Sequence, residues 1–401
     1  MSTPVSEERA PLADGPRPPV VAIDASRNRS GGAKAHLLGV LEAVDPREHG
    51  VAGVHLWSTA ELVRALPDRP WLTKHSPAAL AGSLPQQLWW QARQLSTELR
   101  AAGCDILLST DAGTVCHHHP NVVMSRDMLS FEGREMYRYP LLSFARTRLE
   151  LLKHMQVASL RRAEGAVFLT EYAARVIQGF SGPLANVRVI PHGVSESFRG
   201  VARAQDPDEP ARELRCLYVS NADLYKHQWH VIRAVARLRR EGLKVRLALL
   251  GGGQGPAQAL MEQALAEEDP ERRFVDVLGA VPHDQIPRHL AQADLFLFAS
   301  SCENMPNTLL EGMAAGLPIA SSNRGPMPEI LQDAGTYFDP EDPASIARAL
   351  APLVRDARLR AELAKKALAL AARYSWRRCA EETWSFLVEV WRRQRGDAGP
   401  R

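Results

Sequence analysis

Short apolar runs that alternate with helical patterns limit the fold of this chain more than any other feature of its sequence. One helical pattern in the first half, 33–44, repeats leucine and valine at the spacing of a single helical face. Such alternation predicts a parallel sheet with helices on both faces. The apolar runs of the first half lie at 20–23, 51–57, 105–109, 122–124, 166–169 and 187–190.

A second alternation follows after an interruption. The segment 196–213 contains glycine, two prolines and five acidic residues, so that it cannot form a buried element and is interpreted as a linker. Beyond it the chain returns to strands and helices, and it finishes in an amphipathic helical pattern. The apolar runs of the second half lie at 217–219, 245–250, 274–278, 295–299, 318–320 and 336–338.

The 401 residues therefore divide into two doubly wound α/β halves, which fits the usual domain size of ~100–200 residues. Open α/β sheets bind ligands beyond the carboxyl ends of their strands, so the chemistry is expected in a cleft between the halves. The predicted division is a disordered tail at 1–19, a Rossmann-like domain at 20–195, a linker at 196–213, a second Rossmann-like domain at 214–375 and a C-terminal helix at 376–395.

Composition excludes several classes of protein. A net charge of +3 is too small for sequence-independent binding of nucleic acid, so no nucleic-acid partner is expected. The five cysteines are scattered without a C-x-x-C pair, which favours a reduced, cytoplasmic compartment. No apolar run approaches the ~18–20 residues of a membrane span, so any membrane contact is expected to be peripheral, at the inner face of the membrane.

The strongest chemical signal is the segment 300–318. A strand is expected to end before it, Pro306 suits a first helical turn and Gly316 suits a helix end. Glu303 then lies at the entrance of the helix and Glu311 lies inside it. Free N–H groups at the start of the helix can bind anionic groups, and carboxylates can accept hydrogen bonds from sugar hydroxyls. A solvated helix with two ordinary acids is the alternative, which the surrounding small and polar residues disfavour.

Glu303 and Glu311 match the E-x7-E motif, and the chain resembles the retaining nucleotide-sugar glycosyltransferases of sequence family four, which have the GT-B fold. Three further segments are similar to family motifs. They are 186–194, with His192 where an asparagine is usual, 251–256 and 324–329. The resemblance implies two Rossmann-like domains facing a cleft, with the acceptor domain first, the donor domain second and the C-terminal helix crossing back to the first.

The resemblance also implies the donor site. Glu311 would hold the nucleotide ribose, Glu303 would lie beside the transferred sugar and Lys226 would bind the diphosphate. Asn221 stands where an arginine is usual, so one positive charge is missing, and Arg324 or Lys34 is a candidate to replace it. The loop 279–286 is expected to touch the base through backbone groups. The full expected donor-binding set is Gly31, Gly32, Asn221, Lys226, Gly251, Asn304, Met305, Pro306, Asn307, Thr308 and Glu311.

On the acceptor side, Arg126 occupies a position where many relatives carry a histidine. Asp127 becomes the better candidate for orienting an acceptor hydroxyl, and His118, from the run 117–119, is an alternative acceptor-side residue. Three adjacent histidines cannot all converge on one ion, so no metal site is expected there. With Lys226 and helix ends facing the leaving diphosphate, neither a metal nor another cofactor is expected.

The segment 134–162 contains seven basic and two acidic residues with interleaved aromatic and leucine side chains. A basic amphipathic helix of this kind can lie on anionic lipid, and it can equally be a solvated helix that covers the first domain. Both interpretations stay open.

The predicted function is transfer of a hexosyl unit, of mannosyl or glucosyl type, from a nucleoside diphosphate sugar to a hydroxyl of a saccharide or lipid-linked saccharide, in polysaccharide or glycoconjugate biosynthesis. Glu303, Asp127 and Lys226 form the expected catalytic set, with Glu303 at the oxocarbenium-like centre. Two alternatives remain: a sugar-nucleotide epimerase of the same fold, and a non-catalytic assembly protein, which Asn221 and Arg126 suggest.

Overall fold

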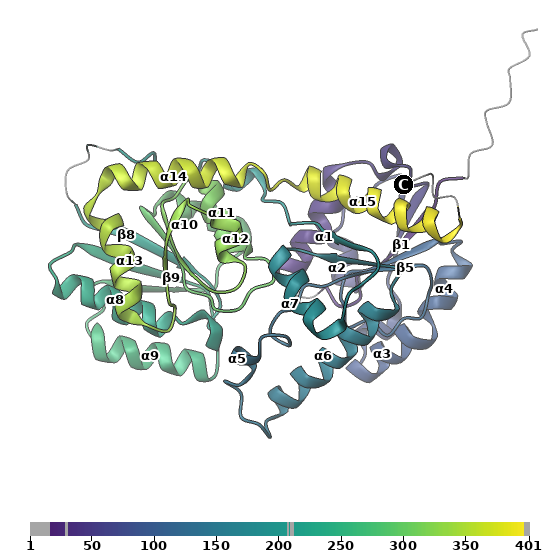
Figure 1. Cartoon of the computed structure of the whole chain (residues 1–401), viewed down its shortest axis with the longest axis horizontal. Coiled ribbons are helices and arrows are strands. Elements are labelled where there is room, and N and C mark those ends of the chain that lie inside the picture. The colour runs from purple at the N-terminus through teal and green to yellow at the C-terminus, as the bar shows by residue number, and fades with distance from the viewer. Residues whose placement is uncertain (1–16, 29–30, 207, 209–211, 397–401) are drawn as a thin grey trace, which may run out of the picture.

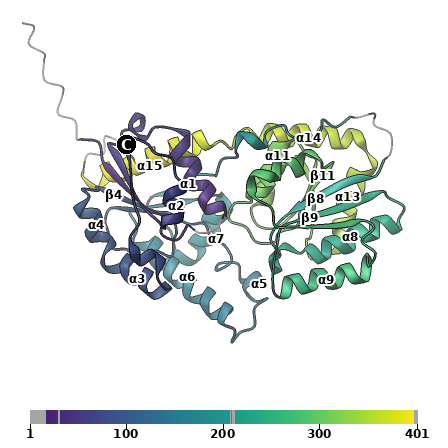
Figure 2. The same ribbon diagram turned by 180° about the vertical axis from the view of Figure 1, so that it is seen from behind.

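The computed structural model describes residues 17–28, 31–206, 208 and 212–396. Within these residues the chain forms two α/β units side by side, each built on one parallel sheet (Figure 1). Seen from the front and from behind, helices lie on both faces of each sheet (Figure 2). The predicted fold class, two doubly wound parallel sheets, is therefore confirmed.

The first sheet has the order β3-β2-β1-β4-β5-β6-β7, with every neighbouring pair parallel. Its strands are β1 (Val20–Asp24), β2 (Gly53–Trp57), β3 (Leu72–His75), β4 (Ile106–Ser109), β5 (Asn121–Met124), β6 (Gly165–Phe168) and β7 (Val187–Val189). Its helices are α1 (Gly31–Ala43), α2 (Ala60–Ala65), α3 (Leu84–Arg93), α4 (Leu95–Ala101), α5 (Gly133–Met136), α6 (Phe144–Arg162) and α7 (Glu171–Ser181).

The second sheet has the order β10-β9-β8-β11-β12-β13 and is also parallel. Its strands are β8 (Leu214–Val219), β9 (Val245–Leu250), β10 (Val275–Gly279), β11 (Leu295–Phe298), β12 (Ile319–Ser322) and β13 (Gly335–Phe338). The helices are α8 (Gln228–Arg240), α9 (Pro256–Glu268), α10 (Ile286–Ala291), α11 (Asn307–Ala315), α12 (Met327–Leu331), α13 (Pro343–Arg355), α14 (Ala357–Ala371) and α15 (Trp376–Gln394).

Strand β3 was not predicted, although twelve other strands match apolar runs. Its residues, Leu72-Thr73-Lys74-His75, include one buried side chain, because β3 is the edge strand beside β2. An edge strand needs no continuous apolar run, so the hydrophobic pattern gives no signal there. By contrast, every residue of the central strands β4 and β11 is buried.

Helix α15 returns to the first unit, as expected, and packs against α1 (Figure 1). Close backbone approach makes this return feasible. A Cβ atom at Gly39 of α1 would lie 2.2 Å from the Trp376 ring, and one at Gly193 would lie 2.2 Å from the Trp376 backbone nitrogen. The two glycines therefore allow the last helix to seal the back of the cleft between the units.

The basic segment 134–162 is not a single helix. It contains the end of α5, a loop at 137–143 and α6, and the loop forms the lowest projection in Figure 1. Pro140 lies in the loop, and Ser143 caps α6 by accepting a hydrogen bond from the Arg146 N–H at 3.2 Å. Proline and a serine cap favour this break between the two helices.

Candidate functional site

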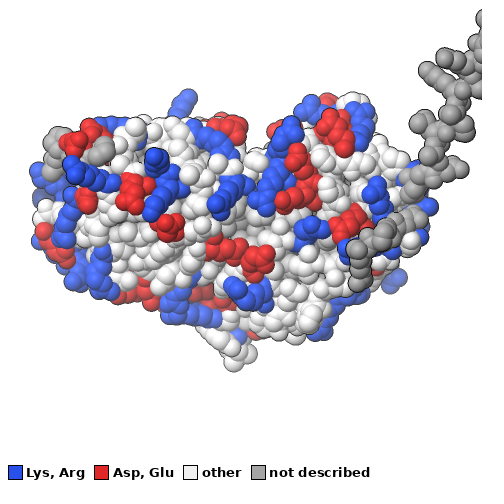
Figure 3. Space-filling model, turned by 45° about the horizontal axis from the view of Figure 1, so that its top comes forward, with Lys and Arg blue, Asp and Glu red and all other residues white. Residues whose placement is uncertain are grey.

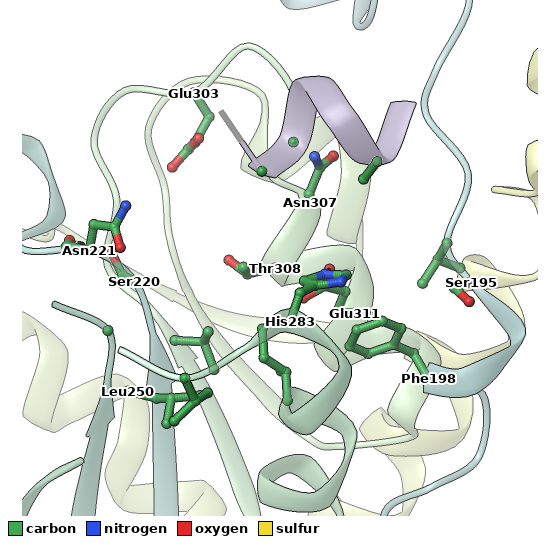
Figure 4. Close-up of a pocket in the computed structure, with 18 of the residues that line it drawn as sticks. Ser195, Phe198, Ser220, Asn221, Leu250, His283, Glu303, Asn307, Thr308 and Glu311 are labelled. Atoms are coloured by element: carbon green, nitrogen blue, oxygen red, sulfur yellow. Dashed lines mark hydrogen bonds and ion pairs between the residues drawn. The ribbon is translucent and has the colours of Figure 1, made fainter. Parts of the chain in front are cut away.

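A cleft of about 730 Å³ lies where the carboxyl ends of the two sheets face each other. The first unit contributes the start of α1 and residues 193–195, and the second contributes the ends of β8 and β9 and the start of α11 (Figure 4). Of the predicted donor-side residues, those that line the cleft are Gly31, Gly32, Asn221, Lys226, Gly251, Glu303, Asn307, Thr308 and Glu311. Asn304, Met305 and Pro306 are buried in the loop that leads into α11.

Glu303 and Lys226 form an ion pair in the cleft. The Lys226 ammonium contacts Glu303 Oε1, and both side chains are about 15% exposed. The ammonium also lies 5.1 Å from the centre of the Tyr225 ring and 5.7 Å from that of Phe298. A lysine held by one carboxylate and two aromatic rings is placed to exchange its carboxylate for a more highly charged anion.

Glu311 is buried on α11 and faces the opposite end of the cleft. Its Oε1 accepts a hydrogen bond from His283 Nε2 at 2.8 Å, and its Oε2 is buried without a hydrogen-bond partner. Burial raises the pKa of Glu311, and the bond to Glu311 raises the pKa of His283. The His283 ring lies 5.2 Å from the ring of Phe198, and Figure 4 shows His283 between Glu311 and Phe198.

The amino ends of α1 and α11 meet at the cleft. A Cβ atom at Gly32 would lie 3.2 Å from Asn307 Nδ2, so a larger residue would press on the start of α11. At Gly251 φ is +139°, and a Cβ atom there would lie 2.0 Å from the Ser220 carbonyl oxygen. Glycine is therefore required at Gly251. At the amino ends of α1 and α11, two sets of free backbone N–H groups face the cleft.

The two residues expected to replace the charge missing at Asn221 are each paired with a carboxylate outside the cleft. Arg324 pairs with Asp339 at 2.9 Å, and Lys34 pairs with Glu61 at 2.7 Å. Neither residue lines the cleft, and Lys34 faces a separate cavity beside α2. Among the described residues that line the cleft, Lys226 is the one lysine or arginine.

The acceptor-side candidates lie in different places. Arg126 and Asp127 follow β5 at the carboxyl edge of the first sheet, where the Asp127 carbonyl accepts a hydrogen bond from Asn304 at 3.4 Å. The Asp127 carboxylate accepts bonds from the Ser130 hydroxyl at 2.6 Å and from the Gln156 amide at 3.1 Å, so it is engaged within its own unit.

The structure does not bring His118 to the cleft. Its carbonyl accepts a hydrogen bond from the side chain of Asn121, the first residue of β5, at 2.8 Å. His118 therefore lies at the amino edge of the first sheet, and burial lowers the pKa of its imidazole. A run of histidines before the start of a strand lies at the opposite edge of the sheet from the carboxyl ends of the strands, where ligands bind.

The cleft-lining residues that sequence reasoning did not assign to the site include His283, Phe198 and Trp376, which carry aromatic rings. His283 lies in the loop that was expected to act through its backbone, and Phe198 lies in the segment interpreted as a linker. Phe198 is buried, in a short 3-10 turn at 196–198. A lone aromatic residue in a polar segment was the available signal for Phe198. Trp376 was assigned to the C-terminal helix, and only the return of that helix brings it to the cleft.

The described residues hold no group of three or more histidine, cysteine, aspartate or glutamate side chains arranged to bind a metal ion. In the same part of the chain, no helix combines the length and the apolar character needed to cross a bilayer.

Comparison with known proteins identifies the second half of the chain. Residues 203–369 match the family model of glycosyl transferases group 1. The O-antigen chain mannosyltransferase B of Escherichia coli is 28% identical over 167 residues, which are 42% of this chain and 44% of that protein. The chain spans about half the length of the curated relatives that it matches, and these include other mannosyl- and glucosyltransferases.

Solved structures extend the likeness of the fold to almost the whole chain. The sucrose-phosphate synthase of Thermosynechococcus elongatus superposes with a TM-score of 0.73 at 17% identity, over 95% of this chain and 100% of that one. Anabaena HepE in complex with UDP and glucose superposes with a TM-score of 0.64 at 17% identity, over 91% and 96%. Residues 203–369 therefore form a domain of the glycosyl transferases group 1 family, and the chain as a whole shares the two-sheet GT-B architecture of these solved structures.

Proposed function

We propose that the protein transfers a hexosyl unit from a nucleoside diphosphate sugar to a hydroxyl of a saccharide or lipid-linked saccharide, with retention at the anomeric carbon. The observation that carries the proposal is one cleft that combines two helix amino ends, Lys226 and a buried carboxylate with a free oxygen on Glu311. The mannosyl or glucosyl type of donor is supported by relatives named as mannosyl- and glucosyltransferases.

The diphosphate is proposed to bind at the amino ends of α1 and α11. Backbone N–H groups at Gly31 and Gly32, the side chains of Asn307 and Thr308, and the Lys226 ammonium surround this position. Helix amino ends favour phosphate by their free donors and their dipole, and Gly251 lets the chain pass close to the donor. With these groups facing the leaving diphosphate, we propose that no metal is needed, and unchanged turnover in EDTA would support this.

The nucleoside is proposed to occupy the other end of the cleft. Ribose hydroxyls would donate hydrogen bonds to Glu311, whose Oε2 has no partner, and the base would lie near the rings of His283 and Phe198. The proposed division of the chain follows from this arrangement: 20–195 for the acceptor and 214–375 for the donor, with 196–213 as the linker, although Phe198 of the linker also lines the cleft.

In the proposed reaction, the bond between the anomeric carbon and the diphosphate oxygen breaks as a bond to the acceptor oxygen forms on the same face. The proton of the acceptor hydroxyl passes to the departing phosphate oxygen. Lys226 stabilises the growing negative charge of the diphosphate, and Glu303 stabilises the positive charge at the sugar ring. Asp127 is proposed to orient the acceptor loop rather than to take the proton, because protein donors already engage its carboxylate.

Peripheral membrane contact through 134–162 is also proposed. The proposal rests on the apolar tip of this segment, residues 141–144, which are the end of the loop at 137–143 and the first residue of α6. Leu141, Leu142 and Phe144 are 76%, 95% and 85% exposed. The tip is the uncharged projection at the lower edge of Figure 3, whereas basic and acidic side chains are interspersed elsewhere on the visible face. Arg134 and Arg138 pair with Glu341 of the second unit, so insertion of apolar side chains is expected to contribute more than charge.

The first test is the melting temperature with UDP, GDP, ADP and dTDP. A ligand at ~100 times its dissociation constant stabilises by about 2.7 kcal/mol, so one nucleotide should raise the melting temperature clearly. NMR with the matching sugar donor, with and without acceptor saccharide, then separates transfer from epimerisation. Binding to none of the four nucleotides, or conversion of the donor without any acceptor, would contradict the proposal.

The membrane contact has its own test. Flotation with anionic liposomes should retain the wild type and should lose the double variant Leu142→Ser, Phe144→Ser. The matched control is Leu151→Ser, which lies on α6, 62% exposed and away from the tip, and which should float like the wild type. A wild type that stays out of the lipid fraction would refute the membrane contact.

A further inference from the structure

Arg126 follows β5 at the carboxyl edge of the first sheet and has no anionic partner among the described residues. One amino group, Nη2, donates to the neutral side-chain oxygen of Asn28 at 2.8 Å. The other two donors, Nε and Nη1, are buried and have no hydrogen-bond partner. No carboxylate in the described part of the chain forms an ion pair with Arg126, and Asp111, whose charge acts on it, lies 3.9 Å from the Arg27 side chain.

The groups around Arg126 do not neutralise its charge. Burial and the Arg126 charge both lower the pKa of the imidazoles of His36 and His192, so both rings are neutral at pH 7. The rings stack with their centres 4.6 Å apart. Both ring nitrogens of His36 and Nε2 of His192 are buried without hydrogen-bond partners. The cluster of Arg126, His36 and His192 thus has five unpaired buried nitrogen atoms.

A buried cation and unpaired donors are costly, and proteins rarely keep them without a ligand or water that pairs with them. The cluster is also close to the donor side. His192 Nδ1 lies 3.2 Å from Asn307 Oδ1 at the start of α11, and Asn304, next to Glu303, bonds to the backbone of Asp127. Whatever pairs with Arg126 therefore lies beside the reacting groups.

We infer that Arg126 binds an anionic group, a carboxylate or a phosphate, carried by the saccharide that occupies the acceptor side of the cleft. The planar guanidinium with its free Nε and Nη1 suits two oxygens of one such group. A neutral hexose would leave the cation unpaired. The inference rests on the proposed function for the saccharide, and it narrows the substrate class to acidic sugars, either the transferred unit or the acceptor.

The test uses D-glucuronate and D-glucose 6-phosphate as probes, with D-glucose as the neutral control, at constant ionic strength. Binding is measured by calorimetry on the wild type, on Arg126→Met and on the control Arg175→Met, an exposed arginine of α7 in the same unit. Each series is run with and without saturating nucleoside diphosphate, so that failure of nucleotide binding is seen separately from failure of the anion site.

We expect at least one acidic sugar to bind the wild type at least tenfold more tightly than glucose, because a hydrogen bond to a charged group contributes about that much. Arg126→Met should abolish this preference and Arg175→Met should keep it. Arg126→Met should also melt at a higher temperature than the wild type without ligand, because it removes an unpaired buried cation.

The source of the anion is found by comparing the nucleoside diphosphate donors of glucuronate and glucose. A preference for the glucuronate donor that depends on Arg126 assigns the anion to the transferred sugar, and a preference among free sugars alone assigns it to the acceptor. Equal binding of glucose and both acidic sugars, or an Arg126→Met protein that keeps the preference, would overturn the inference. So would competition between nucleotide and acidic sugar that depends on Arg126, because Arg126 would then belong to the diphosphate site.

Discussion

Substitution of Glu311 by glutamine should separate nucleotide affinity from stability. The Oε2 atom of Glu311 is buried and unpaired, so it is the acceptor that a ribose hydroxyl can reach. Glutamine keeps an oxygen for His283 and replaces the free oxygen by an NH₂ group. The lost charge-assisted hydrogen bond is worth about 2 kcal/mol, which corresponds to a dissociation constant roughly 30-fold higher.

The stability of the free protein should not fall in the same variant. Burial raises the pKa of Glu311, so ionisation of this carboxyl in the folded protein costs free energy at any pH above its unfolded pKa. Glutamine removes that cost, and at a pH above the folded pKa of His283, where the charged pairing with Glu311 is already lost, the free energy of unfolding should stay equal or rise. Calorimetric titration with the best nucleotide and urea denaturation measure the two quantities.

Combining the Glu311→Gln variant with a modified nucleotide tests whether Glu311 and the ribose hydroxyls interact directly. A 2′,3′-dideoxy form of the nucleotide should bind the wild type roughly 30-fold more weakly than the ribonucleotide, and it should bind Glu311→Gln and wild type alike, because the hydroxyls and the carboxylate act on each other. If Glu311→Gln weakens the ribonucleotide and the dideoxynucleotide equally, Glu311 acts on the shape of the cleft, and the ribose assignment is wrong.

Three other outcomes follow from the same site. Glu303→Gln should lower kcat by about a hundredfold or more with little change in nucleotide affinity, measured by steady-state kinetics and calorimetry, and unchanged turnover would exclude it from the chemistry. Lys226→Met should weaken a nucleoside diphosphate far more than the nucleoside, and equal losses would place the diphosphate elsewhere. His283 has its pKa raised above 6.5 by Glu311, so its pairing stabilises the free protein fully below pH 6.5 and is lost as the pH rises through the folded pKa. The stability of the wild type relative to His283→Asn, measured by urea denaturation, should therefore fall as the pH rises over that range, and a difference that stays constant would contradict the pairing.

The sequence predicted the fold well where strands are buried on both faces. All four residues of β11 and three of the four residues of β4 are apolar, so their apolar runs are readily recognised, whereas the edge strand β3 has one buried leucine among polar residues. In the site, the order of strand, loop and helix fixed the place of Glu303 and Glu311 along the chain. His283 could not be found this way, because it meets Glu311 across 28 residues through the packing of the 279–286 loop against α11.

The contacts that join the two units explain why the site depends on both. The Glu329 carboxylate accepts hydrogen bonds from the Glu171 and Tyr172 N–H groups at the start of α7, at 2.9 and 2.8 Å. The Thr170 hydroxyl donates to the carbonyl of Asn304, next to Glu303, at 3.0 Å. Hydrogen bonds of this kind can be exchanged for water at small net cost, unlike buried apolar contacts. The loop that carries Glu303 is thus positioned by contacts from the first unit, so any movement that separated the two units would withdraw the support of that carboxylate.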